Sequence, residues 1–441
     1  MKKTVFIIFM SVIISISLWI RVDAFQTGDD YQVQDSEIEL KLAQEFTISE
    51  LVLYAYDNNP EILAAKQAWK STSEKYGVVT GYPDPEISVT YFPKPIETRT
   101  GPQDWNATIS QVVPFPGKLT KAGEVVQVEA QIAKLNLDTA VRNIATSISQ
   151  SYYELFYIQE ARKIAQHHAK LLDKLIKYAE TKYVQNRTVF SDVVKSQSDV
   201  AQLSYDIILL DEQELSEITN LNSLLNRPPD APLGQTKNVE VRPLLYSLNE
   251  LYEIAAKNRE EIRVAQAEIK KAEAQADLAR YENLPEFKVG FFYADIGEPD
   301  IAEPPRDANE DAYGVQLGMS IPLWFGKNTS RKAEAKASVQ KAKAMKSNIV
   351  NQTYTQIRTL YLKVANAERL ITLYRDKMLP QAMEATDKAE TWFKQQEGSF
   401  SDFVEAQKAT YNFQLSMARA QADYGINLAA LEQMVGVTLT D

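Results

Sequence analysis

The chain contains one sequence unit written twice, and this duplication limits the possible folds more than any other feature. At an offset of 200 positions, Pro60-Glu61-Ile62 corresponds to Glu260-Glu261-Ile262 and Pro85-Glu86 to Pro285-Glu286. At an offset of 210, Ala179-Glu180-Thr181 corresponds to Ala389-Glu390-Thr391 and Phe190-Ser191-Asp192 to Phe400-Ser401-Asp402. An offset that drifts slowly across half of the chain is typical of an ancient duplication.

The two units meet at a Pro-rich segment between Arg227 and Pro243. We predict a first structural repeat over residues 25–230, a connector over 231–247 and a second repeat over 248–441. Each repeat reads as helix, strand, loop, strand, very long helix, turn and helix. The strands are expected near 86–92 and 105–113, and near 286–294 and 312–321. The helical hairpins are expected to turn near 186–190 and 396–400.

The helical segments carry coiled-coil spacing. Apolar residues step by three and four in the first helix of each repeat and again in the last long helix, which is the spacing of a heptad seam. These seams run through Ile62 to Val79, Ile262 to Ala279 and Ile357 to Met378. From Glu124 to Arg227 there is no glycine or proline, so a single helix would be ~150 Å long at ~1.5 Å per residue. Pro380 is expected to kink or interrupt the second long helix.

The strand segments alternate between apolar residues and small or polar ones. The alternation is strictest in the last strand, whose apolar members are expected to face lipid; these are Tyr313, Val315, Leu317, Met319 and Ile321. Aromatic residues gather at both ends of the strands, as they do at the two interfaces of a bilayer. The other reading is a half-buried sheet in a water-soluble domain.

The N-terminus has the layout of a secretory signal peptide over residues 1–24. Two lysines precede an apolar stretch, and Val22-Asp23-Ala24 offers small residues at a cleavage site. The alternative is an uncleaved membrane anchor. After residue 24 there is no further run of about 18 apolar residues, but an exported bacterial chain without a helical span can still meet a membrane through β-strands.

Composition excludes several classes of function. The chain has no cysteine, and its two histidines are neighbours that point about 100° apart on a helix, so no catalytic thiol and no histidine-based centre is expected. A net charge of −11 argues against a nucleic-acid-binding protein. No phosphate-binding loop is present. We therefore expect no enzyme activity, no cofactor and no metal site.

Four strands leave two open edges, and an open edge is not tolerated in hydrocarbon. The smallest bacterial barrels have about eight strands, so the barrel must be shared between chains. Two copies would give eight strands and three copies twelve, and the sequence alone leaves both open.

The chain resembles the TolC-like outer-membrane efflux proteins over essentially the whole length that follows the signal peptide. The resemblance rests on the duplicated unit, on Pro114-Phe115-Pro116-Gly117-Lys118 with its echo Gly326-Lys327, and on residues 398–407 at the second hairpin tip. The Pro-Gly-Lys run is most similar to the outer-membrane members of heavy-metal efflux systems. The resemblance implies a mainly α fold with a membrane β-barrel contribution: a homotrimer with a twelve-stranded barrel in the outer membrane and an α-helical tunnel across the periplasm.

The same resemblance implies two functional regions. Thr188, Val189, Gly398 and Ser399 would lie at the tips that dock a periplasmic adaptor protein, and Asp402, Glu405 and Asp192 would form the periplasmic gate. This sequence departs from the family pattern at Thr188, where glycine is expected, and it has Lys195 where Glu405 falls in the second repeat. A ring of carboxylates from three chains would favour cations and would respond to pH. A simpler reading is that Asp402 caps its helix.

We therefore expect a passive exit duct in the outer membrane of a Gram-negative bacterium, surrounded by outer-membrane lipid and reaching into the periplasm. It would receive substrates from an adaptor and an inner-membrane pump, which we expect to be proton-driven. The substrate, whether metal cation, drug or polypeptide, is not encoded in any motif. The alternative is a periplasmic coiled-coil scaffold or adhesin-like interaction protein.

Overall fold

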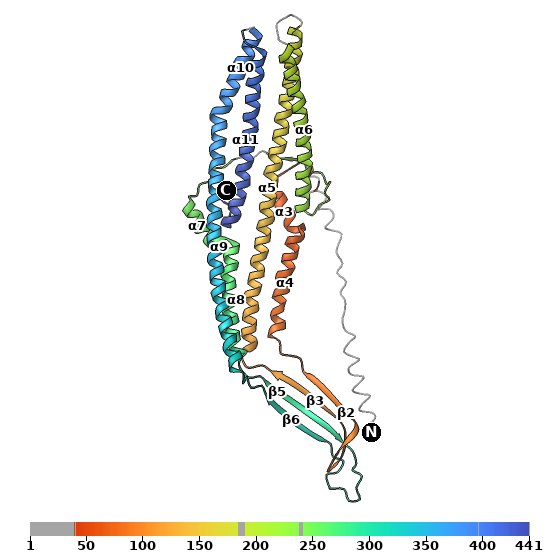
Figure 1. The fold of residues 1–441 in the computed structure, drawn as a ribbon. Helices are drawn as coiled ribbons and strands as arrows, with labels where there is room; N and C mark the ends of the chain where they lie inside the picture. Colours follow the sequence, from red (N-terminus) through yellow and green to blue (C-terminus); the bar gives the residue numbers. More distant parts are fainter. Residues whose placement is uncertain (1–38, 40, 184–189, 238–240, 396, 441) are drawn as a thin grey trace.

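A computed structural model of the chain describes residues 39, 41–183, 190–237, 241–395 and 397–440. The expected signal peptide, residues 1–24, lies outside the described residues, and so do Thr188 and Val189. The molecule is long and mostly helical, with a four-stranded sheet at one end and two helical hairpins at the other (Figure 1).

The same order of elements runs through the chain twice. The first half contains α3 (Ile48–Asn58), α4 (Pro60–Thr80), β2 (Glu86–Thr98), β3 (Gly101–Val113), α5 (Lys118–Tyr183) and α6 (Phe190–Leu224). The second half contains α7 (Leu248–Asn258), α8 (Glu260–Tyr281), β5 (Phe287–Ile296), β6 (Ala312–Met319), α9 (Phe325–Leu373), the π-helical turn η2 (Tyr374–Met378), α10 (Leu379–Gln395) and α11 (Phe400–Val435). Two short strands, β1 (Glu45–Phe46) and β4 (Gln235–Thr236), pair in parallel.

Helices α3 and α7 begin in the same way, 200 positions apart. Thr47 caps α3 in a reciprocal capping box with Glu50, and Ser247 caps α7 in the same arrangement with Glu250. In each box the cap hydroxyl accepts from a backbone N–H of the first turn and the glutamate accepts from the cap residue. Short polar sequences thus set the start of both helices.

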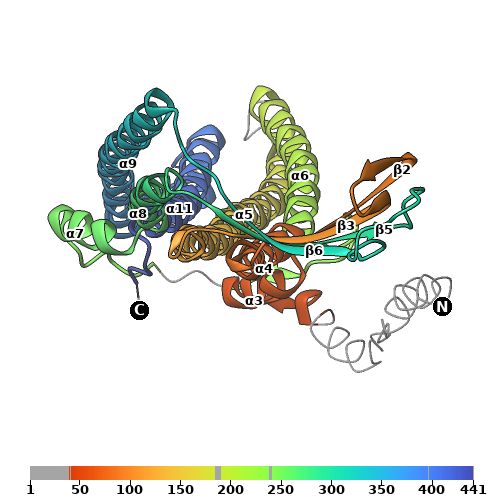
Figure 2. The same ribbon diagram turned by 90° about the horizontal axis from the view of Figure 1, so that it is seen from below.

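The long helices form a curved wall. Helix α5 packs against α4 and α8 in its first part and against α6 and α11 further along, while α9 packs against α8 and α11. Seen along the long axis, α9, α8, α5 and α6 follow an arc, and α3 and α7 lie on its convex side (Figure 2). None of the helices in the described ranges is both long enough and apolar enough to cross a membrane.

The heptad seams are covered to different degrees. In α9 the residues Ile357, Val364 and Ile371 are buried against α7 and α11. In α4 only Ile62 is fully buried, whereas Trp69 is 38% exposed and Tyr76 41% exposed. Because α4 is an edge helix of the wall, a single chain gives it a neighbour on one side only.

Pro380 interrupts the regular hydrogen bonding of the second long helix, as the sequence predicts. The turn before it, η2, is π-helical, and α10 then continues from Leu379. A proline lacks the backbone N–H that an α-helix needs, and a wider turn accommodates this loss without ending the helix.

The sheet has the antiparallel order β2-β3-β5-β6, with β2 and β6 at its edges. Ile87, Ile109, Phe291 and Val315 are aligned across the four strands in that order. The neighbouring row on the other face runs through Ser88, Thr108, Phe292 and Gly314. One face is therefore largely apolar and the other is small or polar with an occasional aromatic residue.

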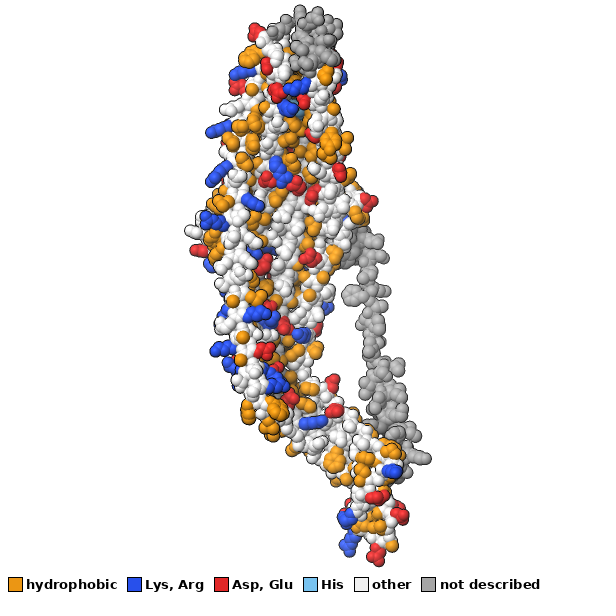
Figure 3. All heavy atoms as spheres, in the orientation of Figure 1, with side chains coloured by type: hydrophobic (Ala, Val, Ile, Leu, Met, Phe, Trp, Pro, Cys, Tyr) orange, Lys and Arg blue, Asp and Glu red, His pale blue; other side chains and the backbone are white. Residues whose placement is uncertain are grey.

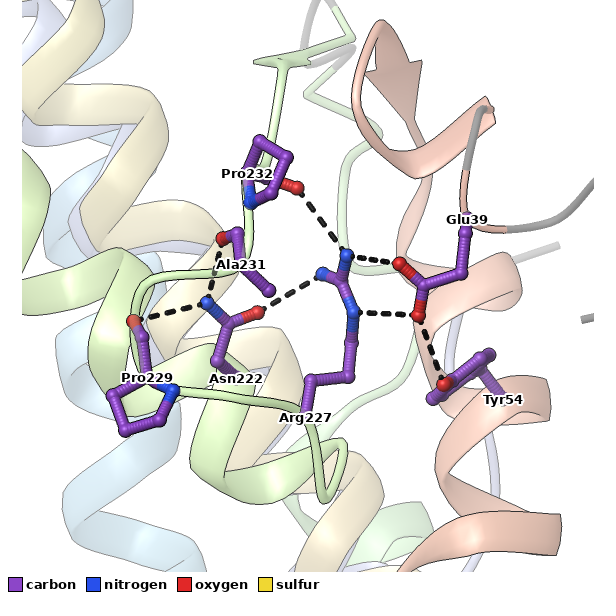
Figure 4. A network of polar contacts seen from close by, with 7 residues as sticks. All are labelled: Glu39, Tyr54, Asn222, Arg227, Pro229, Ala231 and Pro232. Carbon is purple, nitrogen blue, oxygen red and sulfur yellow. Dashed lines mark hydrogen bonds and ion pairs between the residues drawn. The ribbon is translucent and has the colours of Figure 1, made fainter. Parts of the chain in front are cut away.

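A buried polar network fastens the start of the described chain to the end of α6 (Figure 4). The side chain of Arg227 is 1% exposed, and its Nη2 and Nε donate to the two carboxylate oxygens of Glu39 at 2.7 and 3.0 Å. Arg227 also donates to Asn222 and to the carbonyl of Pro232. The Tyr54 hydroxyl completes the network by donating to Glu39. The network stands beside the β1–β4 pair, and both join segments that are far apart in sequence.

Candidate functional site: the hairpin tip and the sheet

The turn between α10 and α11 is built by backbone contacts and one cap. The backbone N–H groups of Glu397 and Gly398 donate to the carbonyl oxygen of Trp392 at 2.9 and 3.2 Å. Ser399 then caps α11, because its hydroxyl accepts from the N–H of Asp402 at 3.0 Å. A side chain at position 398 would place its Cβ 3.0 Å from the Cβ of Trp392, so glycine suits this turn.

Three aromatic rings and a small core hold the tip in place. Phe393 packs against Phe400 in a tilted arrangement and stacks on Phe403, with ring centroids 5.3 and 6.3 Å apart. Phe403 is 1% exposed. The core beneath the tip joins residues of α5, α6 and α11; its buried members are Leu172, Ile176, Val193, Leu203, Phe400 and Val404. The two helical hairpins of one chain therefore share an apolar seam close to their ends.

Two ion pairs cross from α6 to α11 along this seam, and they run in opposite directions. Lys195 of α6 contacts Glu405 of α11 at 2.9 Å, and Lys408 of α11 contacts Asp199 of α6 at 3.4 Å. The hydrogen bond from Lys195 holds the pKa of Glu405 below its ordinary value. The sequence predicted that Glu405 would face other carboxylates, which would raise its pKa; within one chain its nearest partner is a cation.

The predicted gate acids occupy different surroundings. Asp402 is exposed in the first turn of α11, where an acid suits the N-terminus of a helix, while the N-cap residue itself is Ser399. Asp192 is the third residue of α6. Gly398 and Ser399 lie at the turn between α10 and α11, while the docking residues Thr188 and Val189 fall outside the described part of the chain.

A buried histidine, His168 of α5, lies further from the tip along the same seam. His168 of α5 is 7% exposed and stacks on Tyr411 of α11, with ring centroids 4.7 Å apart and planes 11° apart. Burial lowers the pKa of His168 to about 4. The sequence predicts no catalytic or metal-binding role for His168, and the seam between α5 and α11 that buries it is not visible in the local pattern around position 168.

The apolar face of the sheet is open to its surroundings in a single chain. The residues predicted to face lipid are all exposed: Tyr313 by 75%, Val315 by 71%, Leu317 by 78%, Met319 by 55% and Ile321 by 63%. The first four lie in β6, which ends at Met319, so Ile321 follows the strand. Figure 3 shows that charged side chains are sparse over the middle of the sheet and gather again at its loop end.

The loops at the far end of the sheet are tied to each other. Arg99 in the β2–β3 turn contacts Asp307 in the β5–β6 loop at 2.5 Å, and the N–H of Asn309 donates to the carbonyl of Thr100. Gly101 has a φ of +138°, and a Cβ there would lie 1.8 Å from the carbonyl oxygen of Gly297. The close approach of two backbones thus requires glycine at this position.

Comparisons with known proteins agree with this arrangement. Residues 251–437 match the family model described as outer membrane efflux protein. No curated protein sequence matches the chain.

Several solved structures share the fold. The outer membrane protein VceC from Vibrio cholerae has a TM-score of 0.71 at 17% identity, over 89% of this chain and 96% of that one. The open state of the outer membrane channel MtrE from Neisseria gonorrhoeae has a TM-score of 0.71 at 16% identity, over 89% of each chain. CmeC from Campylobacter jejuni, an outer membrane channel, has a TM-score of 0.70 at 12% identity, over 89% of this chain and 86% of that one. Residues 251–437 thus resemble the outer membrane efflux protein family, and the described residues adopt the fold of these outer membrane channels.

Proposed function

We propose that three copies of this chain form a passive exit duct in the outer membrane. The four strands of each copy would contribute to one twelve-stranded barrel, and the helical walls would join into a tunnel through the periplasm. The single observation that carries this proposal is the sheet, which has one exposed apolar face and two edges, β2 and β6, that pair with no further strand among the described residues. Backbone groups at such edges need partners in lipid, and sister chains can supply them.

The lateral helices support association as well. Exposed large apolar side chains lie on the helices at the two sides of the wall. On one side they are Trp69, Tyr76 and Val78 of α4 with Tyr205, Ile208 and Leu215 of α6; on the other they are Met345, Leu362 and Leu373 of α9 with Met383 and Trp392 of α10. Apolar residues on both sides of a curved wall favour a closed ring. In such a ring the α4 and α6 side of one copy would contact the α9 and α10 side of the next.

The curvature of the wall indicates which of its sides would face the axis of the ring. Its concave side would face the common axis, and α3 and α7 would project outward (Figure 2). The helical hairpins would then point away from the membrane. Thr188, Val189, Gly398 and Ser399 would meet the adaptor, and Asp192, Asp402 and Glu405 would line the periplasmic gate.

Channels of this family work with an adaptor and an inner-membrane pump. For this chain we infer a proton-driven pump and a duct that performs no chemistry on its cargo. The scaffold alternative is not favoured, because the fold is that of outer-membrane channels.

Cysteine cross-linking tests the shared barrel directly, because the natural chain has no cysteine. Ser88→Cys in β2 is combined in turn with Gly314→Cys, Gln316→Cys or Gly318→Cys in β6. Within one chain β3 and β5 separate these strands, by roughly 14 Å at ~4.8 Å per strand, which exceeds the reach of a disulfide. We expect at least one pair to yield covalent trimers on a denaturing gel.

The matched control pairs Ser88→Cys with Thr108→Cys, which face each other within one chain. This pair is expected to oxidise without joining chains. If every β2–β6 pair stays monomeric while the control pair oxidises, the shared barrel is wrong.

A further inference from the structure

A groove on the convex side of the wall is a second candidate site, distinct from the tips. It has a volume of about 900 Å³ and lies between α3, α5, the start of α8 and the end of α11. It brings together Ile48 to Tyr56 of the first half with Ala429 to Thr438 of the second. Neither the strands nor the helical hairpin tips contribute to it.

The floor of the groove carries an unsatisfied carboxylate. Glu260, the first residue of α8, is 5% exposed, and its Oε1 accepts from Nε of Arg142 at 2.7 Å. Its Oε2 is buried and has no hydrogen-bond partner among the described residues. A buried acceptor left without a partner is destabilising, so a donor that reaches this carboxylate would be stabilising.

The surrounding charges favour a cation. In the part of the chain that the structure describes, the groove is lined by three carboxylates, those of Asp138, Glu260 and Glu432, and by one cationic side chain, that of Arg142. Burial raises the pKa of Glu432 even though the N–H of Leu439 donates to its Oε1 at 2.8 Å and Arg142 lies nearby, so its charged form is only partly compensated. An ammonium or guanidinium group in the groove would compensate both glutamates.

The lip of the groove is apolar. Leu53 is 67% exposed and Tyr56 is 42% exposed, and both line the groove from α3. A groove with an apolar rim and acidic residues inside it is complementary to a lysine or arginine of an amphipathic segment. The aliphatic stem of such a side chain covers the apolar rim while its charged end reaches the carboxylates.

We propose that this groove docks a basic, amphipathic segment of a periplasmic partner protein, with a lysine or arginine of the partner directed at Glu260 and Glu432. The proposal rests on the proposed duct in one respect: the convex side of each copy must form the outside of the ring. A neighbouring copy is a poorer occupant, because the exposed apolar residues that suit ring contacts lie on α4, α6, α9 and α10 at the two sides of the wall.

The test uses the full-length assembled protein in detergent and a fluorescein-labelled probe peptide of repeated Leu-Lys-Ala-Leu units. A matched peptide carries glutamine in place of lysine. We expect the lysine peptide to bind and the glutamine peptide to bind at least about tenfold more weakly in fluorescence anisotropy. Glu260→Gln and Glu432→Gln should each weaken binding of the lysine peptide about tenfold, and Leu53→Ser should weaken both peptides.

Glu384→Gln is the matched control. It removes an exposed carboxylate of α10 that pairs with Lys388, far in sequence and structure from the groove, and it should leave binding unchanged. Equal binding of the two peptides, or an equal effect of Glu384→Gln and Glu432→Gln, would overturn the proposal. Because Glu260→Gln also removes the partner of Arg142, the melting temperature of each variant is measured alongside.

Accessibility of the groove gives an independent test. Leu53→Cys should react with a maleimide-linked polyethylene glycol in the assembled protein. The labelling rate should lie within about threefold of the rate in the denatured chain. A block that appears only in the assembled protein would show that a neighbouring copy covers the groove, and the docking proposal would then be wrong. Trimers that form and conduct ions but do not bind the lysine peptide would overturn docking alone and leave the duct intact.

Discussion

Lys195 and Glu405 occupy equivalent positions in the two halves of the chain, 210 residues apart, and form an ion pair with one another at 2.9 Å. The duplication placed two parallel helices, α6 and α11, side by side at the same height. At this height α6 carries a cation and α11 an anion. About one turn further on, Lys408 of α11 pairs with Asp199 of α6, with the charges reversed between the two helices.

The first prediction concerns this pair. Lys195→Glu should place two carboxylates against each other and separate α6 from α11 at the tip. Exposed pairs contribute up to about 1 kcal/mol, so we expect up to about a fivefold rise in the open probability of single channels in planar bilayers. The double variant Lys195→Glu with Glu405→Lys should restore the original value. If the double variant behaves like the single one, the contact between the two side chains is irrelevant to opening.

The second prediction concerns pH and His168. Burial lowers its pKa from 6.5 to about 4, so the folded protein binds this proton less readily than the unfolded chain. Stability is therefore fully present above pH 6.5 and declines as the pH falls toward 4, by up to about 3 kcal/mol per chain at ~1.36 kcal/mol per pH unit. Asp199, Lys408 and His167 are the charged or titratable neighbours that act on it.

The measurement compares urea unfolding of the natural protein and His168→Phe from pH 7.5 to pH 4. The variant keeps a ring against Tyr411 but has no proton to bind, so the two stability curves should converge or cross as the pH falls. Parallel curves would contradict the assignment of this pH dependence to His168.

The third prediction distinguishes the two faces of β6. Leu317→Lys places a charge on the apolar face and should destabilise the folded channel in lipid by about 2–4 kcal/mol per chain if the position lies near the middle of the bilayer. Gln316→Lys, the adjacent residue on the opposite face, should alter ion selectivity with little effect on folding. Refolding into lipid vesicles followed by urea titration measures both. Equal destabilisation by the two substitutions would show that the faces are not differently exposed.

The fourth prediction concerns the network around Arg227. Arg227→Ala leaves the Glu39 carboxylate and the Asn222 amide without their partner in a site where the arginine side chain is 1% exposed. Because the Glu39 side chain that remains is 39% exposed and keeps its hydrogen bond from Tyr54, we expect a loss of about 1–3 kcal/mol. We expect a lower melting temperature and faster proteolysis near residue 39. The exposed Arg375→Ala, which removes a pair with Asp376, is the control and should change neither.

The fold followed from the sequence where the determining interactions are local or periodic. The alternation from Tyr313 to Met319 appears as β6, and the proline at 380 appears as a π-helical turn followed by a continuing helix. The capping boxes at Thr47 and Ser247, which were not predicted above, also depend only on residues three positions apart. Such features need no knowledge of distant contacts.

Features that depend on long-range packing were harder to predict. The seam of α4 has the same spacing as that of α9, yet Trp69 and Tyr76 are partly exposed, because periodicity shows that a face is apolar and does not show which chain covers it. The partner of Glu405 was also missed. The sequence showed Lys195 at the equivalent position, but only the packing of α6 beside α11 turns that correspondence into a contact.

The widened turn at residues 374–378 makes the two hairpins of one chain unlike each other, since α5 passes the corresponding region as an uninterrupted α-helix. In an assembly of three copies, six hairpins would surround the axis, and the two shapes would alternate. A protein that binds the end of the tunnel would then meet two kinds of binding site in alternation. A ring of six identical subunits would therefore have to bind in two different orientations, one for each kind of hairpin.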